Sequence, residues 1–403
     1  MLAQIKFEKQ NKTNKTNKIE LADIFREYQH MLPYAGDDEW KVINAITSCR
    51  TQKLGWHVYR CDNCHYEETV FNSCRNRHCP KCQGLAKAKW ILQRDSELLP
   101  VHYFHLVFTL PHVFNPLILK NKKQMYSLLF KSVSETLRQV VANPDNLGVS
   151  CGFFSILHTW DQCLNLHPHV HCVIPGGGLS PDKCEWISSA KRFFVPVRKL
   201  SKVFRGKFVS CLDKMHTSGD LAFYGDVSAL KIYGNFKALL KKSCKSDWVV
   251  YSKPPFKGPH WALRYLARYT HRIAISNSRI IGSKDGKVLF TYRDRKHGNV
   301  KKVMIMDPVT FMQKFLLHVL PPKFVRIRYY GFLGNTVKKK NLALIRNLLG
   351  DNSEQANDQE DIPSCWVDLM IYLTGEDPAV CKICGTGHMV NATAVPATRT
   401  RYG

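Results

Sequence analysis

Three histidines alternate along the apolar, strand-like segment Leu166–Pro175, which reads LHPHVHCVIP. Because side chains alternate across a strand, His167, His169 and His171 share one face, and the apolar residues between them face the other way. Two imidazoles at this spacing supply half of a divalent-metal site. The alternative is a chance run of histidines on a surface strand.

A cysteine-rich block at residues 57–82 contains two CxxC pairs, Cys61/Cys64 and Cys79/Cys82. Each pair can place two thiolates on one ion, and two pairs complete a tetrahedral zinc site. Four protein ligands leave no open position on the ion, so the block predicts a structural role for zinc.

Two further candidate ligands, Cys74 and His78, lie between the CxxC pairs. They could replace one of the four cysteines or belong to a larger site. Arg75 and Arg77 stand beside them, and their positive charge suggests that this module contacts nucleic acid.

The segment 259–273, PHWALRYLARYTHRI, is expected to form a helix. At about 100° per residue, Tyr265 and Tyr269 fall on one side, opposite a stripe that contains two leucines. Arg268 and Arg272 flank the two phenols. A phenol can act as a covalent nucleophile where neighbouring cations stabilise its ionised form. The alternative is a pair of packing tyrosines on a surface helix.

Together these groups suggest one reaction on a phosphodiester. A metal ion held by imidazoles polarises the phosphate, and a tyrosine attacks phosphorus in line. The products are a phosphotyrosyl link and a free 3′ hydroxyl. A second tyrosine lets one site hold or exchange two strands.

The composition favours a nucleic-acid partner, because 59 Lys and Arg residues against 32 Asp and Glu give a net charge of +27 over 403 residues. Fifteen cysteines, an odd number, favour metal binding in a reducing compartment over disulfides. No apolar stretch is long enough to span a bilayer, and the polar N-terminus lacks the apolar core of a signal peptide. We therefore expect a cytoplasmic protein without a membrane partner.

The order of expected elements predicts an α+β fold, with a central antiparallel sheet and helices packed against it. Four segments are expected: a disordered basic tail (1–18), a helical zinc-binding domain (19–99), a catalytic domain (100–335), and a linker with a C-terminal CxxC tail (336–403).

Three motifs in this order resemble the HUH-type rolling-circle transposases of bacterial insertion sequences, two-tyrosine enzymes related to Helitrons and relaxases. In chain order these are CxxC…SCRNRHCPKCQ, HPHVH followed by GGG, and the helix RYLARYTHRIAIS. The resemblance covers about residues 20–335. It implies an HUH endonuclease core that acts on single-stranded DNA at transposon ends and on target DNA. It also implies that the protein associates with the bacterial nucleoid.

The resemblance also implies roles for individual residues. His169 and His171 match the metal ligands of the family, and Tyr265 and Tyr269 match its nucleophile pair. Mg²⁺ or Mn²⁺ is the implied catalytic ion. The zinc-binding domain of the family is matched by the four cysteines Cys61, Cys64, Cys79 and Cys82.

The motif leaves the third ligand of the catalytic ion open. Gln162 is favoured and Asp161 comes next, because an oxygen donor suits a hard ion such as Mg²⁺. His167 and His158 are weaker alternatives.

The C-terminal pair Cys381/Cys384 is only half of a zinc site, and it could form a zinc knuckle with His388 or Cys365. A pair without a metal-binding role is the alternative.

Two other functions also stay open: a rolling-circle replication initiator with the same active site, and a zinc-dependent DNA-binding regulator without chemistry. Neither the oligomeric state nor the DNA sequence recognised is encoded in these motifs.

Overall fold

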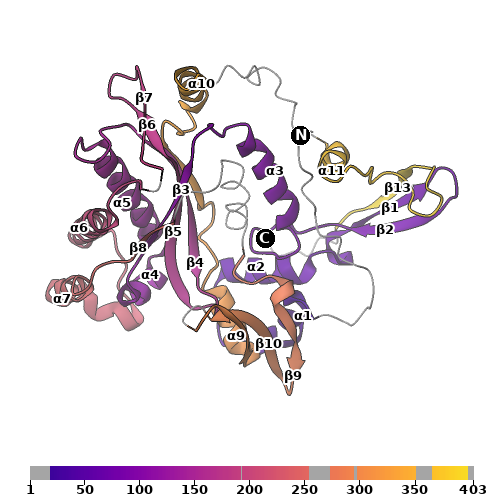
Figure 1. The fold of residues 1–403 in the computed structure, drawn as a ribbon. Helices are drawn as coiled ribbons and strands as arrows, with labels where there is room; N and C mark the ends of the chain where they lie inside the picture. Colours follow the sequence, from indigo (N-terminus) through magenta and orange to yellow (C-terminus); the bar gives the residue numbers. More distant parts are fainter. Residues whose placement is uncertain (1–18, 192, 254–272, 295–296, 351–364, 398–403) are drawn as a thin grey trace. The chain divides into compact units, whose positions relative to one another are not determined.

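The computed structural model describes residues 19–191, 193–253, 273–294, 297–350 and 365–397 (Figure 1). The chain divides into two compact units. Unit 1 comprises residues up to 93 together with 275–313 and the chain from 357 onward, and unit 2 comprises 94–274 and 314–356. Among the described residues, no helix combines the length and apolarity needed to cross a bilayer.

Unit 2 is built on a five-stranded sheet in which every neighbouring pair is antiparallel. The sheet therefore confirms the predicted α+β class with a central antiparallel sheet. Its order is β12 (Ile327–Gly331), β4 (Gly152–Trp160), β5 (Leu166–Pro175), β3 (Tyr103–Thr109) and β8 (Val250–Lys253).

One face of this sheet carries the main core of unit 2. Val170 and Cys172 of β5 pack there with Leu106 of β3, and all three are fully buried. The long helices α5 (Lys122–Ala142) and α6 (Val197–Thr217) cover this face and contact each other (Figure 1). The histidines of β5 consequently point to the opposite face, as the alternation along the strand predicts.

Smaller elements complete unit 2. The glycines 176–178 lead from β5 into the short hairpin of β6 (Gly177–Leu179) and β7 (Trp186–Ser188). Glycine is required at position 178, where a Cβ would lie 2.5 Å from the carbonyl oxygen of Ser150. Among its described residues, unit 2 also contains α4 (Asn115–Lys120), α7 (Tyr233–Ser243) and α10 (Lys338–Leu348).

Unit 1 contains two small antiparallel sheets and short helices. The first sheet has the order β13 (Met389–Val395), β1 (Trp56–Cys61) and β2 (Glu67–Phe71), and the second has β11 (Val300–Met306), β10 (Lys287–Asp294) and β9 (Ile280–Lys284). Its helices include α1 (Leu21–Tyr28), α2 (Asp37–Ser48) and α11 (Trp366–Thr374), whereas α3 (Gln83–Asp95) and α9 (Pro308–Leu316) extend across the unit boundaries.

This division differs from the boundaries expected from the sequence. Residues 275–313, expected in the catalytic domain, belong to unit 1 together with the chain from 357 onward. Helix α10, expected in a linker, packs within unit 2, where Leu342 and Ile345 contact a small core that includes Leu99 and Phe332. The expected tail 1–18 lies outside the described residues.

Candidate metal centres and active site

Three imidazoles meet on the face of the unit 2 sheet that lies opposite its main core. His158 lies on β4, directly opposite His169 of β5, and His171 follows two positions along β5. One ring nitrogen of each residue lies within 4.8 Å of the corresponding atoms of the other two. The structure therefore brings together the predicted pair and adds His158, which the sequence had offered only as a weak alternative.

The spacing of these nitrogens suits a shared ion. Nε2 of His171 lies 3.2 Å from Nδ1 of His158. Two imidazole nitrogens bound to one ion at about 2.1 Å lie about 3.0 to 3.4 Å apart. The rings are already close to the arrangement that a shared metal ion requires.

Hydrogen bonds orient two of the three rings. Nδ1 of His169 lies 2.6 Å from the carbonyl oxygen of His167, to which only a protonated nitrogen can donate. Nε2 of His169 is then the unprotonated nitrogen that can bind a metal ion. Nδ1 of His171 is 2.8 Å from Nε2 of His105, and the two rings stack with centroids 5.0 Å apart.

His105 lies on β3 and is 1% exposed. Burial lowers the pKa of His105 to about 3, with smaller contributions in the same direction from the charges of Lys253 and His169. His105 is therefore a neutral imidazole near pH 7, which suits a hydrogen-bond partner of a metal ligand.

The turn that joins β4 to β5 contains both oxygen ligands expected from the sequence. Oδ1 of Asp161 accepts hydrogen bonds at 2.8 Å from the backbone N–H groups of Cys163 and Asn165. Its other oxygen accepts from Nδ2 of Asn165 at 2.8 Å. Asp161 thus holds the turn together, while the role of Gln162 as a ligand stays a prediction.

Among the described residues, His167 is not grouped with this cluster. His167 lies at the edge of the sheet face, and its Nδ1 is 3.3 Å from Nε2 of His112. The expected nucleophiles Tyr265 and Tyr269 lie outside the described residues, as do Arg268 and Arg272.

The cysteines of unit 1 form two clusters rather than the single site expected from the sequence. Cys79 and Cys82 belong to the first cluster, and Cys61 and Cys64 belong to the second, so the two CxxC pairs do not share an ion. The first cluster contains Cys49, Cys74, Cys79 and Cys82, and the second contains Cys61, Cys64, Cys381 and Cys384.

Sulfur distances in the first cluster match zinc coordination. Sγ of Cys82 lies 3.5 Å from Sγ of Cys49 and 3.6 Å from Sγ of Cys74. A tetrahedral zinc ion about 2.3 Å from each sulfur sets the sulfurs about 3.8 Å apart, whereas a disulfide requires about 2.05 Å. Burial raises the pKa of the Cys49 thiol to about 11, so a metal ion would have to displace its proton.

Comparison with known proteins assigns the family. Residues 152–341 match the family model described as "Putative transposase", and residues 20–110 match the one described as "Transposase zinc-binding domain". The chain is 46% identical over 377 residues to "Putative transposase y4qJ" of Sinorhizobium fredii (strain NBRC 101917 / NGR234), covering 92% of this chain and 94% of that relative. The chain belongs to the transposase family.

The chain is also similar to the transposase for insertion sequence element IS801 of Pseudomonas savastanoi pv. phaseolicola. The identity is 25% over 373 residues, which cover 91% of this chain and 87% of the relative. No solved structure matches the chain significantly. The family resemblance drawn from the sequence is confirmed, and so is the presence of a zinc-binding domain in the N-terminal region.

Arg75 and Arg77, two of the four arginines expected to contact DNA, stand beside the first cysteine cluster of this transposase. Arg75 is exposed and directly follows Cys74, with a left-handed backbone at φ 52°. Arg77 is half-buried. Their contact with nucleic acid stays a prediction.

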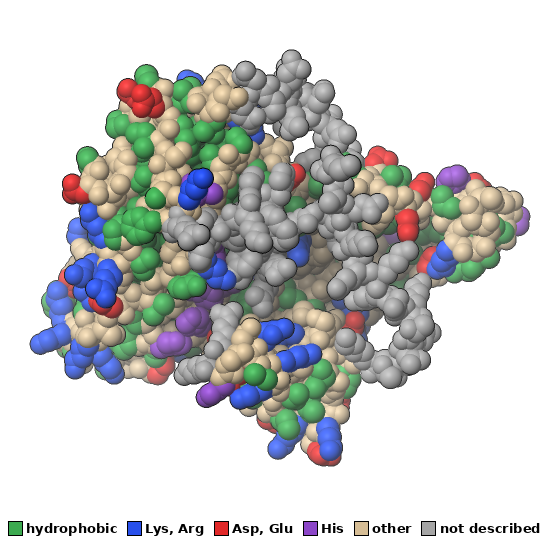
Figure 2. Space-filling model, viewed as in Figure 1, with side chains coloured by type: hydrophobic (Ala, Val, Ile, Leu, Met, Phe, Trp, Pro, Cys, Tyr) green, Lys and Arg blue, Asp and Glu red, His purple; other side chains and the backbone are tan. Residues whose placement is uncertain are grey.

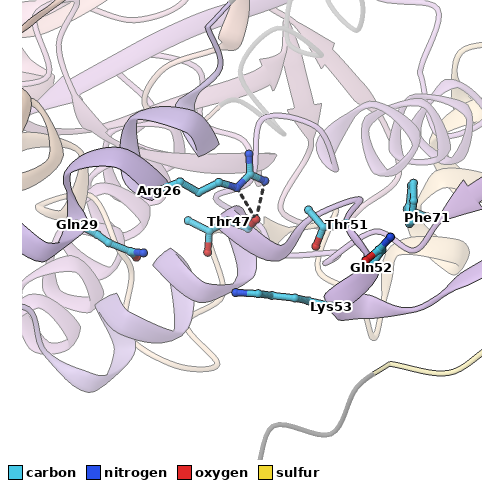
Figure 3. A pocket seen from close by; sticks show the side chains of 7 residues that line it. All are labelled: Arg26, Gln29, Thr47, Thr51, Gln52, Lys53 and Phe71. Atoms are coloured by element: carbon cyan, nitrogen blue, oxygen red, sulfur yellow. Dashed lines mark hydrogen bonds between the residues drawn. The ribbon is translucent and has the colours of Figure 1, made fainter.

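A pocket in unit 1 lies between α1, the end of α2 and β2 (Figure 3). Nε and Nη2 of Arg26 donate to the carbonyl oxygen of Thr47 at 3.1 and 2.6 Å. Among the described residues, those that line this pocket include no histidine, cysteine or carboxylate. The pocket therefore offers hydrogen bonds rather than a reactive group.

Proposed function

We propose that this protein cuts and joins single-stranded DNA at transposon ends by rolling-circle transposition, through a 5′-phosphotyrosine intermediate. The observation that carries the proposal is the convergence of His158, His169 and His171 on one face of the central sheet. A DNA-binding regulator without chemistry has no need of such a cluster, and the family match favours a transposase over a replication initiator.

The donor set of this cluster indicates which catalytic ion would fit. Imidazole nitrogens suit transition ions, whereas Mg²⁺ prefers oxygen ligands. Three imidazoles therefore favour Mn²⁺ over Mg²⁺, unless Gln162 or the DNA supplies further oxygens. When bound, the ion would neutralise charge that develops on the scissile phosphate.

The tyrosines supply the covalent step of the proposal. The phenolic oxygen of Tyr265 or Tyr269 forms a new bond to phosphorus, and the bond from phosphorus to the 3′ oxygen breaks. The phenol loses its proton and the leaving 3′ oxygen gains one. One phosphodiester replaces another, so joining needs no ATP.

A basic surface on unit 2 supports contact with the DNA backbone. Figure 2 shows Lys and Arg side chains gathered at the lower left, over the region of α6 and α7. The exposed lysines of this basic surface are Lys202, Lys214, Lys241, Lys242 and Lys245. Arg75, Arg77, Arg268 and Arg272 are further proposed contacts. Because its proposed substrate is DNA, the protein would act at the nucleoid in the bacterial cytoplasm.

A covalent-adduct assay tests the proposed function. The protein is incubated with Mn²⁺ and a labelled single-stranded oligonucleotide from an element end, and products are separated on a denaturing gel. We expect cleavage with the label retained on the protein through a 5′ phosphate. Substitution Tyr265→Phe or Tyr269→Phe should remove or alter the adduct, whereas Tyr251→Phe, on β8, should leave it unchanged.

Two outcomes of this assay would count against the mechanism. Cleavage without a covalent adduct would exclude a tyrosine nucleophile. His169→Ala and His171→Ala should abolish cleavage while DNA binding persists, so an equal loss of both activities would indicate a structural role for the histidines.

A further inference from the structure

We propose that Cys381 and Cys384 complete a second structural zinc site with Cys61 and Cys64, so that the C-terminal segment closes the zinc-binding domain of unit 1. The matched zinc-binding domain spans residues 20–110 and contains only half of these ligands. The inference does not depend on the catalytic mechanism proposed above.

The sulfurs of this second cluster already have tetrahedral spacing. Sγ of Cys61 lies 3.7 Å from Sγ of Cys384, and Sγ of Cys64 lies 3.7 Å from Sγ of Cys381. All four sulfurs lie within 4.8 Å of one another. A tetrahedral zinc ion requires about 3.8 Å between sulfurs, so both contacts between the two CxxC pairs fit.

The two CxxC segments share the same backbone conformation. The carbonyl oxygen of Cys61 accepts from the N–H of His65 at 3.2 Å, and that of Cys381 accepts from the N–H of Gly385 at 2.9 Å. Both acceptor turns end in a left-handed residue, with φ 57° at His65 and 71° at Gly385. Each segment therefore forms the same kind of knuckle around its sulfurs.

Backbone N–H groups point at the sulfurs in both knuckles. Sγ of Cys61 accepts from the N–H groups of Asn63 and Cys64 at 3.4 Å each. Sγ of Cys381 accepts from Ile383 at 3.4 Å, and Sγ of Cys384 accepts from Gly387 at 3.3 Å. Such donors stabilise thiolates, which are the form of cysteine that binds zinc.

The C-terminal knuckle is also docked through its backbone. The N–H of Asp62 donates to the carbonyl oxygen of His388 at 3.1 Å, and the N–H of His388 donates to Oδ1 of Asp62 at 2.7 Å. Strand β13 then pairs with β1 along its length. A Cβ at Gly387 would lie 2.5 Å from Sγ of Cys61, so this position must be glycine for the knuckles to meet.

The partners that the sequence had suggested for Cys381 and Cys384 are not part of the cluster. Cys365 is the N-cap residue of helix α11, and its Sγ accepts from the N–H of Asp368 at 3.2 Å. Two hydrogen bonds join the backbone of His388 to Asp62, and His388 is not grouped with the four sulfurs. Cys365 therefore provides a matched control from the same region of the chain.

Zinc content tests the proposal directly. Elemental analysis is made on full-length protein that carries His169→Ala and His171→Ala, which removes the imidazole cluster from the count. We expect two zinc ions per chain, one in the added Cys381→Ser, Cys384→Ser double variant, and two in the added Cys365→Ser variant. One ion in the parent, or two in the C-terminal double variant, would overturn the proposal.

Thiol labelling of the unaltered chain covers the case in which the double variant does not fold. An alkylating reagent is applied while a chelator removes zinc in steps, and each cysteine is followed by mass spectrometry. Cys61, Cys64, Cys381 and Cys384 should become reactive together, whereas Cys365 should react from the start. Because Cys64 is exposed, its protection would report metal rather than burial. Labelling of Cys381 and Cys384 together with Cys365 in the zinc-loaded protein would overturn the site.

Discussion

Nδ1 of His171 lies 2.8 Å from Nε2 of His105, on the neighbouring strand of the same sheet. The contact leaves Nε2 of His171 directed toward His158. A proposed metal ligand is thus held in orientation by a buried, neutral imidazole, and this arrangement sets both the tautomer and the ring angle of the ligand.

Removal of the His105 contact should weaken metal binding without abolishing it. We expect His105→Phe to lower the affinity for Mn²⁺ by about 10- to 100-fold, because the hydrogen bond that orients His171 is lost. His105→Gln, which retains a hydrogen-bonding side chain, should have a smaller effect. Calorimetric titration measures the affinity, and excess Mn²⁺ should restore cleavage. Cleavage that stays low at saturating Mn²⁺ would contradict a positioning role, and His112→Ala provides an exposed control.

The identity of the third ligand can be decided by a pair of substitutions. We expect His158→Ala to remove Mn²⁺ binding in the absence of DNA, because one of three converging nitrogens is lost. Gln162→Ala should leave this affinity within a few-fold of the parent, since Gln162 lies in the turn after β4. The opposite ranking in a binding titration would identify Gln162, the ligand favoured from the sequence, as the third ligand.

His318 should make unit 2 sensitive to acid. Its ring bridges Oγ1 of Thr159 and the carbonyl oxygen of Leu164, each at 3.1 Å. Burial lowers the pKa of His318 from 6.5 to about 4. Between pH 6.5 and 4 the unfolded chain therefore binds a proton at His318 that the folded chain does not. The contribution of neutral His318 to the free energy of unfolding is fully present above pH 6.5 and is lost as the pH falls toward 4.

The lost stability from His318 alone is at most about 3 kcal/mol, on the basis of 1.36 kcal/mol per pKa unit. Thermal melts between pH 4 and 7 should show a shallower dependence on pH in His318→Gln than in the parent. Parallel curves for the two proteins would show that His318 does not contribute.

DNA binding should weaken steeply with salt, because counterions return to the phosphates that lysines had neutralised. Lys241→Ala with Lys242→Ala should reduce the slope of log affinity against log salt by about 2. Lys237→Ala is the control, because Nζ of Lys237 already pairs with Oδ2 of Asp213 at 2.9 Å. Binding curves at several salt concentrations measure the slopes. Equal changes in slope from the single substitutions Lys241→Ala and Lys237→Ala would contradict a role for the basic surface.

Local patterns predicted much of the framework correctly. Strand β5 has the bounds Leu166–Pro175 expected from its alternating histidines, and it lies in the central antiparallel sheet that the order of elements predicts. This strand is regular and amphipathic, so its side-chain period is visible in the sequence itself.

The metal centres required information that the local sequence does not contain. His158 joins His169 only because the Asp161 turn fixes the register of β4 against β5. Cys49 stands alone at the end of α2, and Cys384 follows its partner Cys61 by 323 residues. Cys49 has no CxxC partner, and the CxxC pair Cys381/Cys384 is too distant from Cys61 in the sequence for spacing to indicate a shared site.

The pairing of β1 with β13 has a consequence for synthesis of the chain. During translation the first strand leaves the ribosome long before its partner exists, since Asp62 and His388 are 326 positions apart. Until the last segment emerges, one edge of β1 has no partner and is open to association with other chains. A nascent or prematurely terminated copy would therefore be more vulnerable to aggregation and proteolysis than the finished protein.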